Sequence, residues 1–327
     1  MKYDIISIGD TTIDHFFFIH DASTHCGINK EDCYITLHFA DKIAVDKYVR
    51  TIAGNATNNA VASSRLGLKT AFYSVIGDDM QGHSIHWELK KENVSTKFLQ
   101  IDKKNATNIS SVISFKGERT ILVYHAPRDY KLPKLPKARW VYLTSAGPKE
   151  SLPKLHRQVW QYLKNNPNTK LGCNPGTHQM HLGLKAIAPF IKRSEVLSLN
   201  VEETERLLGY KPGTPHKKLL TDMYKVGPKI FVMTNGPQGS YAFDGKTMRF
   251  LEIYDTPILE RTGCGDSYTS GFIAALAYGY DVSEAMRWGT MNSAFVIQEI
   301  GPQKGLLYKG KMISMLRKAK RLKPKVI

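Results

Sequence analysis

The chain has few of the features that would place it in a specialised class of protein. Its 327 residues contain only four cysteines, which form no Cys-x-x-Cys pair and no zinc spacing: Cys26, Cys33, Cys173 and Cys264. No apolar run approaches the roughly 20 residues that a membrane helix needs. The N-terminal apolar run is interrupted by aspartates and makes a poor signal peptide. We therefore expect a cytoplasmic protein with reduced thiols and no membrane partner.

Two common nucleotide-binding signatures are also absent. No Gly-x-x-x-x-Gly-Lys sequence occurs, and no Gly-x-Gly-x-x-Gly follows the first apolar segment. These absences weaken P-loop and dinucleotide-binding interpretations. The eleven histidines show no His-x-x-x-His spacing that would indicate a metal site.

Composition and charge indicate a large core and an uneven distribution of basic residues. The chain is 42% hydrophobic, enough for one large domain, which we place at residues 1–308. The formal net charge is +17, and residues 309–327 contain eight lysines and arginines and no acid. An apolar stripe through Met312 and Leu316 predicts a basic amphipathic helix, packed on the domain or extending from it. A solvated basic face is the ordinary explanation, so we do not expect a nucleic-acid partner.

Strands and helices alternate along most of the chain, which predicts an α/β fold with a mostly parallel sheet covered on both faces. The expected strands are residues 2–9, 70–76, 139–144, 169–173, 195–199 and 229–234, followed by a hairpin of 240–243 with 247–253. The expected helices are residues 56–66, 81–92, 151–164, 201–208, 215–226, 266–279 and 283–298, with another near the end. Two β-rich stretches, residues 15–50 and 96–126, predict a small sheet that stands off the main body.

The strongest local signal is Gly263-Cys264-Gly265-Asp266, which leads directly into an apolar helical pattern. Glycines allow close backbone approach, and the unpaired N–H groups of a helix start favour an anion. A carboxylate at this point suits removal of a proton from a hydroxyl that attacks phosphorus. A glycine turn with Asp266 as an ordinary helix cap explains the same spacing equally well.

Other polar groups are ambiguous in the same way. Gly54, Asn55 and Asn58 open a helix of small residues, and their amides suit a polyhydroxylated ligand as well as a cap. Asn200 and Glu203 have the spacing of a capping box. Asp14 lies just beyond the first strand and is equally open to interpretation.

Taken in order, these motifs resemble the ribokinase-like sugar and nucleoside kinases, also called the PfkB family. The resemblance runs from about residue 3 to about residue 307 and rests on Gly9-Asp10 with Asp14, the 54–67 stretch, Ile76-Gly77-Asp78-Asp79 with Gly82, Asn200-x-x-Glu203, Thr234-Asn235-Gly236-Pro237-Gln238-Gly239 and Gly263-Cys264-Gly265-Asp266. It implies a ribokinase-like three-layer α/β/α sandwich with a small β-sheet lid formed by about 15–50 and 96–126. It also implies phosphoryl transfer from ATP with Mg²⁺ to a primary hydroxyl.

The resemblance further implies a role for each matching residue. Asp266 would be the general base, and the amides of Gly263, Cys264 and Gly265 would form an anion hole. The remaining roles are substrate binding by Asp14, Gly54, Asn55 and Asn58, nucleotide binding by Asn200, Thr234, Gly236 and Gly239, and Mg²⁺ binding through water by Glu203.

The chain departs from the usual family pattern Asp-Thr-Thr-Gly-Ala-Gly-Asp at two points. Glu260-Arg261 replaces Asp-Thr, which leaves the use of a monovalent cation uncertain. Cys264 replaces alanine, and we expect the helix start to lower the pKa of its thiol and make it prone to oxidation.

The substrate class remains open at this point. A free sugar, a nucleoside and a sugar phosphate all fit, the last because basic residues occur in or near the proposed lid: Lys97, Lys103, Lys104, Arg119 and Arg128. Two alternatives are not enzymes. One is a nucleic-acid-binding protein on a kinase scaffold, and the other is an inactive sensor of nucleotide or sugar. A homodimer through the lid sheet is a further expectation.

Overall fold

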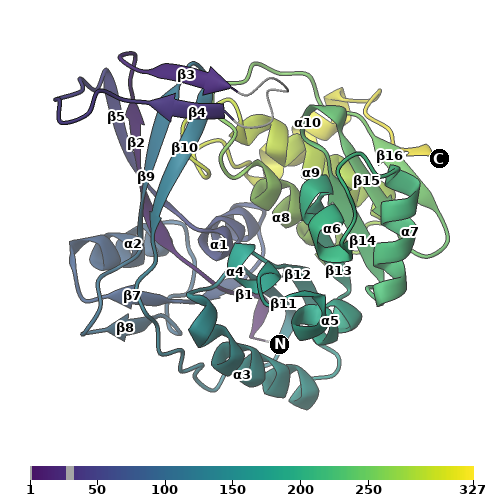
Figure 1. Ribbon diagram of the computed structural model, residues 1–327. Helices are drawn as coiled ribbons and strands as arrows, with labels where there is room; N and C mark the ends of the chain where they lie inside the picture. Colours follow the sequence, from purple (N-terminus) through teal and green to yellow (C-terminus); the bar gives the residue numbers. More distant parts are fainter. Residues whose placement is uncertain (1, 27–32) are drawn as a thin grey trace.

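The structure is a computed structural model that describes residues 2–26 and 33–327 (Figure 1). Within these ranges a nine-stranded sheet has the order β17-β16-β15-β14-β13-β12-β11-β1-β6. The strands from β6 to β14 pair in parallel, and β15, β16 and β17 add an antiparallel edge. Their bounds are β1 Tyr3–Ile8, β6 Thr70–Tyr73, β11 Ala138–Thr144, β12 Lys170–Asn174, β13 Val196–Asn200, β14 Ile230–Thr234, β15 Ser240–Phe243, β16 Met248–Leu251 and β17 Lys325–Val326.

Helices cover both faces of this sheet because its strands are apolar on both sides. In β11, Val141 and Leu143 pack into one core and Trp140 and Tyr142 into the other. The first core includes α3 (Leu152–Asn165), α5 (Leu184–Arg193), α6 (Val201–Leu208) and α7 (His216–Val226). The second includes α8 (Cys264–Ala277), α9 (Val282–Val296) and α10 (Lys309–Lys318). A third cluster joins α1 (Asn55–Arg65) and α2 (Met80–Lys91). The predicted three-layer α/β class is confirmed.

A smaller sheet stands beside the main body, at the left of Figure 1. Its four strands have the order β10-β9-β2-β5, with the bounds β2 Thr12–Phe18, β5 Lys47–Ala53, β9 Ile109–Phe115 and β10 Glu118–Tyr124. Lys116 and Gly117 take φ values of 51° and 81° between β9 and β10. Positive φ at both central residues is what a two-residue hairpin turn requires, and this turn sets the register of the hairpin.

One region of the main domain differs from the sequence expectation. We assigned no helix between residues 173 and 195, yet α4 (Thr177–Met180) and α5 lie there. The parallel pairing of β12 with β13 requires a crossover, which these helices supply. Pro189 lies inside α5 and interrupts the helical pattern in the sequence.

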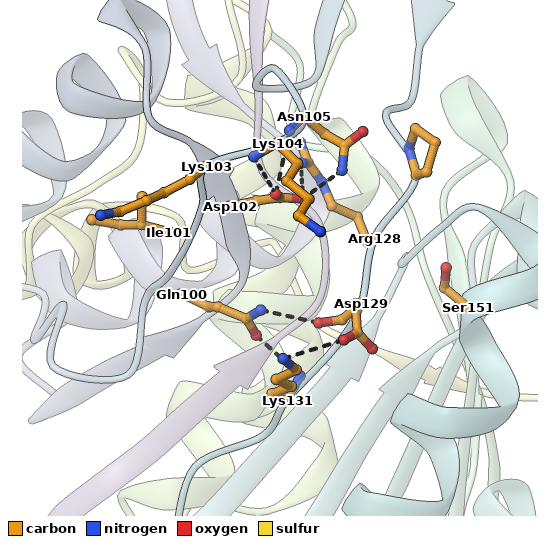
Figure 2. A pocket seen from close by; sticks show the side chains of 11 residues that line it. Gln100, Ile101, Asp102, Lys103, Lys104, Asn105, Arg128, Asp129, Lys131 and Ser151 are labelled. Atoms are coloured by element: carbon orange, nitrogen blue, oxygen red, sulfur yellow. Dashed lines mark hydrogen bonds and ion pairs between the residues drawn. The ribbon is translucent and has the colours of Figure 1, made fainter.

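A cavity of about 480 Å³ lies beside β8 (Gln100–Asp102), which pairs with β7 (Val75–Gly77) (Figure 2). Lys103 and Lys104 line it, together with Arg128 and Lys131. Asp102 accepts the backbone N–H of Lys104 at 2.9 Å and lies 3.4 Å from the Arg128 guanidinium. Carboxylates therefore pair with Arg128 and Lys131 in this cavity, where Lys131 lies 3.4 Å from Asp129.

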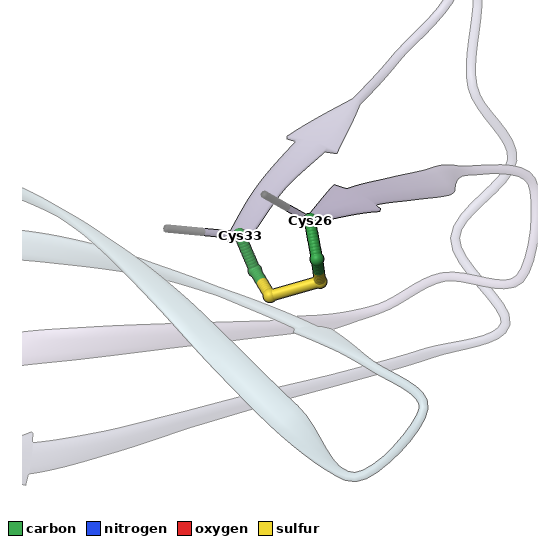
Figure 3. The surroundings of a disulfide bond; sticks show 2 residues. All are labelled: Cys26 and Cys33. Carbon is green, nitrogen blue, oxygen red and sulfur yellow. A yellow bond between two sulfur atoms is a disulfide. The ribbon is translucent and has the colours of Figure 1, made fainter. Parts of the chain in front are cut away.

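The connection between β2 and β5 contains an exposed two-stranded hairpin, β3 (Ser23–Cys26) and β4 (Cys33–Thr36). A disulfide joins Cys26 to Cys33 across it (Figure 3). The prediction of four reduced thiols is therefore wrong for this pair, because antiparallel pairing places the two cysteines opposite each other. Cys173 and Cys264 are free thiols.

The basic C-terminal segment is packed on the main domain. Met312 and Leu316 of α10 are buried against α9, and Leu322 is buried beyond the end of the helix. The guanidinium of Arg287 donates to the carbonyl oxygens of Leu316 and Leu322 at 2.8 Å each. None of the helices in the described part of the chain is long and apolar enough to span a bilayer.

The packing of α10 gives a stability prediction. Met312 has no exposed surface, so Met312→Ala removes buried contacts and leaves a cavity. We expect its free energy of unfolding to fall by about 2–5 kcal/mol in urea denaturation. Ser314→Ala, on the exposed side of the same helix, is the matched control and stays within about 0.5 kcal/mol of the parent. Equal stability of the two variants would mean that α10 is not packed as described.

Candidate active site

The first turn of α8 places a carboxyl group beside exposed backbone amides. Gly263 caps the helix with a φ of 80°, and a Cβ at this position would lie 2.4 Å from the Cβ of Pro302. Only glycine fits both constraints. Apart from its chain neighbours and the backbone of its own helix, no described heavy atom lies within 4 Å of the place where a Cβ on Gly265 would be. Open space therefore lies beside Gly265, whereas the N–H of Cys264 donates to the Arg261 carbonyl oxygen at 3.3 Å.

The Asp266 carboxyl group is buried and held by an amide pair. Its side chain is 8% exposed, and Asn58 Nδ2 donates to its Oδ2 at 2.8 Å. Gln303 Nε2 donates to Asn58 Oδ1 at 3.0 Å, which fixes the orientation of that amide. Burial raises the pKa of Asp266 to about 6, the Asn58 bond lowers it, and the charge of Glu203 raises it. The group is a stronger base than an ordinary aspartate and is still mostly ionised at neutral pH.

The asparagines at the start of α1 have different roles. Asn58 reaches Asp266, whereas Asn59 accepts a hydrogen bond from Ser7 Oγ at 2.6 Å and donates one to Ser270 Oγ at 2.9 Å. Asn59 therefore ties β1 to α8 and is structural. Gly54 caps α1 with a φ of 98°, and Asn55 is the half-buried first residue of that helix.

Asp14 lies on β2 and is 6% exposed. Its Oδ1 has no hydrogen-bond partner in the described ranges. Burial raises the pKa of Asp14 to about 7, a bond with the Ser110 hydroxyl lowers it, and the nearby Glu260 raises it. A buried carboxyl oxygen without a partner is suited to accept a ligand hydroxyl.

The carboxyl ends of β13 and β14 bring Asn200 and Thr234 side by side in register. Asn200 Oδ1 accepts from the backbone N–H of Glu203 at 2.7 Å, and Glu203 Oε2 accepts from that of Asn200 at 2.9 Å. The capping box is therefore real. Burial raises the pKa of Glu203, whose charge also reaches Asp266. Gly236 and Gly239 follow Thr234 with φ values of 49° and 94°.

The departures from the family pattern have structural consequences that were not predicted. Arg119 Nε lies 3.7 Å from Glu260 Oε1, and Arg261 lies 3.8 Å from Glu118. Two consecutive residues of β10 thus face two consecutive residues of the loop before α8. A pair of residues distant in the sequence gives no periodic signal, so the added positive charge at Arg261 was the one hint of these contacts in the sequence.

Cys264 differs from its expectation. Burial raises the pKa of its thiol, although the Ser293 hydroxyl, at 2.8 Å from Sγ, and two arginines lower it. The expected lowering of the pKa at the helix start is therefore wrong, because the side chain points into the protein rather than into the open space. A raised pKa keeps the thiol protonated and unreactive.

The buried Asp14 gives a pH-dependent prediction. Its pKa rises from 3.8 to about 7 on folding, so the native state loses stability as the pH rises through this interval. We expect Asp14→Asn to raise the free energy of unfolding at pH 8, with a gain that shrinks towards pH 4. Denaturant titrations at the two pH values measure this, with the exposed Asp255→Asn as the control. A gain of equal size at both pH values would contradict the burial of a charged group.

The chain is similar in sequence and in fold to known kinases. The model of the pfkB family carbohydrate kinases matches residues 15–307. An ATP-dependent 6-phosphofructokinase from Thermoanaerobacterium thermosaccharolyticum is 23% identical over 92% of this chain and 89% of its own length. Among solved structures, a nucleoside kinase of the ribokinase family from Methanocaldococcus jannaschii has a TM-score of 0.76 at 19% identity, covering 96% of this chain and 98% of its own. Arabidopsis thaliana ribokinase, complexed with ribose and ATP, has a TM-score of 0.78 at 18% identity, covering 97% and 99%. The chain belongs to the pfkB family of carbohydrate kinases, and it is a phosphotransferase of the sugar or nucleoside kinase type.

Proposed function

We propose that the protein transfers the γ-phosphate of ATP to a primary hydroxyl of a sugar or nucleoside, with Asp266 as the general base. The burial of Asp266 at the open first turn of α8 supports this most strongly. Asp266 takes the hydroxyl proton, the hydroxyl oxygen forms a bond to the γ-phosphorus, and the bond from that phosphorus to the bridging oxygen of ADP breaks. The amides of Gly263, Cys264 and Gly265 stabilise the negative charge.

The nucleotide side of the site is proposed at Asn200, Thr234, Gly236 and Gly239, near the carboxyl ends of β13 and β14. Ligands of parallel sheets bind at this edge, and glycines with positive φ allow the backbone to approach them closely. The charge of Glu203 raises the pKa of Asp266, and carboxylate oxygens such as these are the ligands that Mg²⁺ prefers. The residues fit Mg²⁺ held by Glu203 through water. When bound, the ion would neutralise charge on the triphosphate.

The acceptor side is proposed at Asp14, Gly54, Asn55 and Asn58. Asp14 supplies the unpartnered buried oxygen, and Asn58 already contacts the base. The small sheet carries Asp14 and connects to the loop before α8 through Arg119. We infer that this sheet, whose strands overlap the expected ranges 15–50 and 96–126 but begin at Thr12 and extend to Ala53, acts as the lid of a kinase domain that spans residues 1–308, with 309–327 as its basic C-terminal addition.

Asp266→Asn tests the catalytic role. The amide keeps the shape but takes no proton, so we expect kcat to fall about 10²- to 10⁴-fold, with ATP binding and the thermal midpoint little changed. Release of ADP with the best acceptor from a panel of sugars and nucleosides measures the loss. Asp281→Asn is the matched control, because asparagine still caps α9 there. Full turnover by the Asp266 variant would remove the proposed base.

The exposed side of the small sheet supports a homodimer. All seven residues of β10 are exposed, including Ile121, Leu122, Val123 and Tyr124. These apolar residues alternate between the two faces of an edge strand, and an exposed apolar edge is a surface that another copy of the chain could cover.

Leu122→Lys tests this proposal. Leu122 is 60% exposed, and a lysine there would place a charge in the interface. We expect light scattering to give a dimer mass for the parent and a monomer mass for the variant. Met80→Lys replaces an apolar side chain of 82% exposure on α2 and should remain a dimer. A monomeric parent would exclude the proposal.

A further inference from the structure

A second buried carboxyl group, Asp10, lies outside the residues assigned above. It follows β1 directly and is 5% exposed. Its Oδ1 accepts a hydrogen bond from the hydroxyl of Tyr130 at 3.2 Å, and Tyr130 also donates to the carbonyl oxygen of Gly147 at 2.7 Å. Its Oδ2 has no hydrogen-bond partner anywhere in the described chain. An unpaired buried carboxyl oxygen is costly, so a functional explanation is required.

A histidine with an unpaired nitrogen lies beside this oxygen. His125 Nδ1 is 3.6 Å from Asp10 Oδ2 and is itself buried without a hydrogen bond to any described residue. The ring of His178 packs edge-on against that of His125, with 5.1 Å between ring centroids. Burial lowers the pKa of His125 to about 4, so its ring is neutral at physiological pH. Two unsatisfied polar atoms thus lie next to each other, and neither neutralises the other.

This pair lies on the acceptor side of the site. The backbone of Asp10 touches Gly54, since a Cβ on Gly54 would lie 2.7 Å from the Asp10 carbonyl oxygen. The carbonyl of Gly54 accepts the backbone N–H of Asn58, whose side chain contacts Asp266. Asp14, two residues into β2, presents the third unpartnered oxygen. The start of α1 therefore links Asp10 to Asn58 and, through Asn58, to the base.

The neighbouring charges do not suit an anionic acceptor. The side chain of Arg128 is 1% exposed and donates to the Ala106 carbonyl and to Asn108 Oδ1, at 2.6 and 3.1 Å, besides its ion pair with Asp102, while its buried Nε has no partner among the described residues. Arg119 faces Glu260. Lys103 and Lys104 line the separate cavity beside β8, and the Lys103 side chain points away from Asp102 (Figure 2). Of the basic residues that made a sugar phosphate attractive, Arg119 and Arg128 are thus paired with carboxylates, and Lys103 and Lys104 line a different cavity.

We propose that Asp10 Oδ2 and His125 Nδ1 bind hydroxyl groups of the acceptor, and that they make the site specific for an uncharged polyhydroxylated compound rather than a sugar phosphate. This inference rests on the proposed function. It differs from the substrate named for the phosphofructokinase relative, whose acceptor already carries a phosphate. Hydroxyl groups can donate to the unpaired oxygens of Asp10 and Asp14, whereas an ionised phosphate oxygen only accepts hydrogen bonds and leaves those oxygens unsatisfied.

The test measures ADP release by the full chain with ATP and a panel of free pentoses, hexoses and nucleosides, each beside its monophosphate. We expect kcat/KM for the best uncharged acceptor to exceed that for its monophosphate by at least about a hundredfold. In Asp10→Asn, KM for that acceptor should rise roughly tenfold or more, with KM for ATP unchanged. His125→Phe, which keeps a ring but removes both nitrogens, should raise the same KM.

The controls separate the two proposals. Asp46→Asn changes an exposed Asp that pairs with His20 at 2.6 Å on the small sheet, and it should leave both KM values unchanged. Thermal midpoints of the variants, with and without acceptor, distinguish loss of binding from loss of folding. Two outcomes would overturn this inference alone. One is turnover confined to monophosphates. The other is a KM for the acceptor that is the same in Asp10→Asn and His125→Phe as in Asp46→Asn. No turnover with any acceptor would overturn the proposed function and this inference with it.

Discussion

The site depends on one arrangement, in which a carboxyl group is buried at the open start of a helix with a single side-chain hydrogen bond to hold it. Asp266 accepts from Asn58, and Asn58 is held in turn by Gln303. Burial without a cationic partner gives the carboxyl group its raised pKa. Gly263 can occupy its left-handed conformation against Pro302 only because it has no side chain. The 302–303 segment therefore positions both the helix start and the amide that orients Asp266.

The parallel sheet determines where the remaining groups lie. Its carboxyl edge brings Asp10, Asn200 and Thr234 to one side of the molecule, although they are far apart in the sequence. Helices α1 and α8 pack on one another and bring Asn58 to Asp266. Asn59 strengthens this packing by joining β1 to α8. Scaffold and site are thus built from adjacent residues of the same helix.

Local patterns in the sequence were enough to predict the α/β class and most of its strands and helices. Motif order pointed to the kinase family, and the capping box of Asn200 with Glu203 is present as its spacing indicated. Contacts between distant segments had no such signal. Asn58 and Asn59 look alike in the sequence, yet only tertiary packing assigns one to the site and the other to the scaffold. The orientation of Cys264 and the pairing of Cys26 with Cys33 likewise depend on the fold.

The paired charges of Glu118-Arg119 and Glu260-Arg261 link the small sheet to the loop that precedes α8. Any separation of the hairpin from this loop would break both contacts. Glu260 is almost inaccessible to water, so withdrawal would strip a buried charge of its nearest cation. Salt should therefore weaken the contact between the hairpin and the loop, because dissolved ions screen the exposed pair of Arg261 with Glu118 more than the largely buried pair of Arg119 with Glu260.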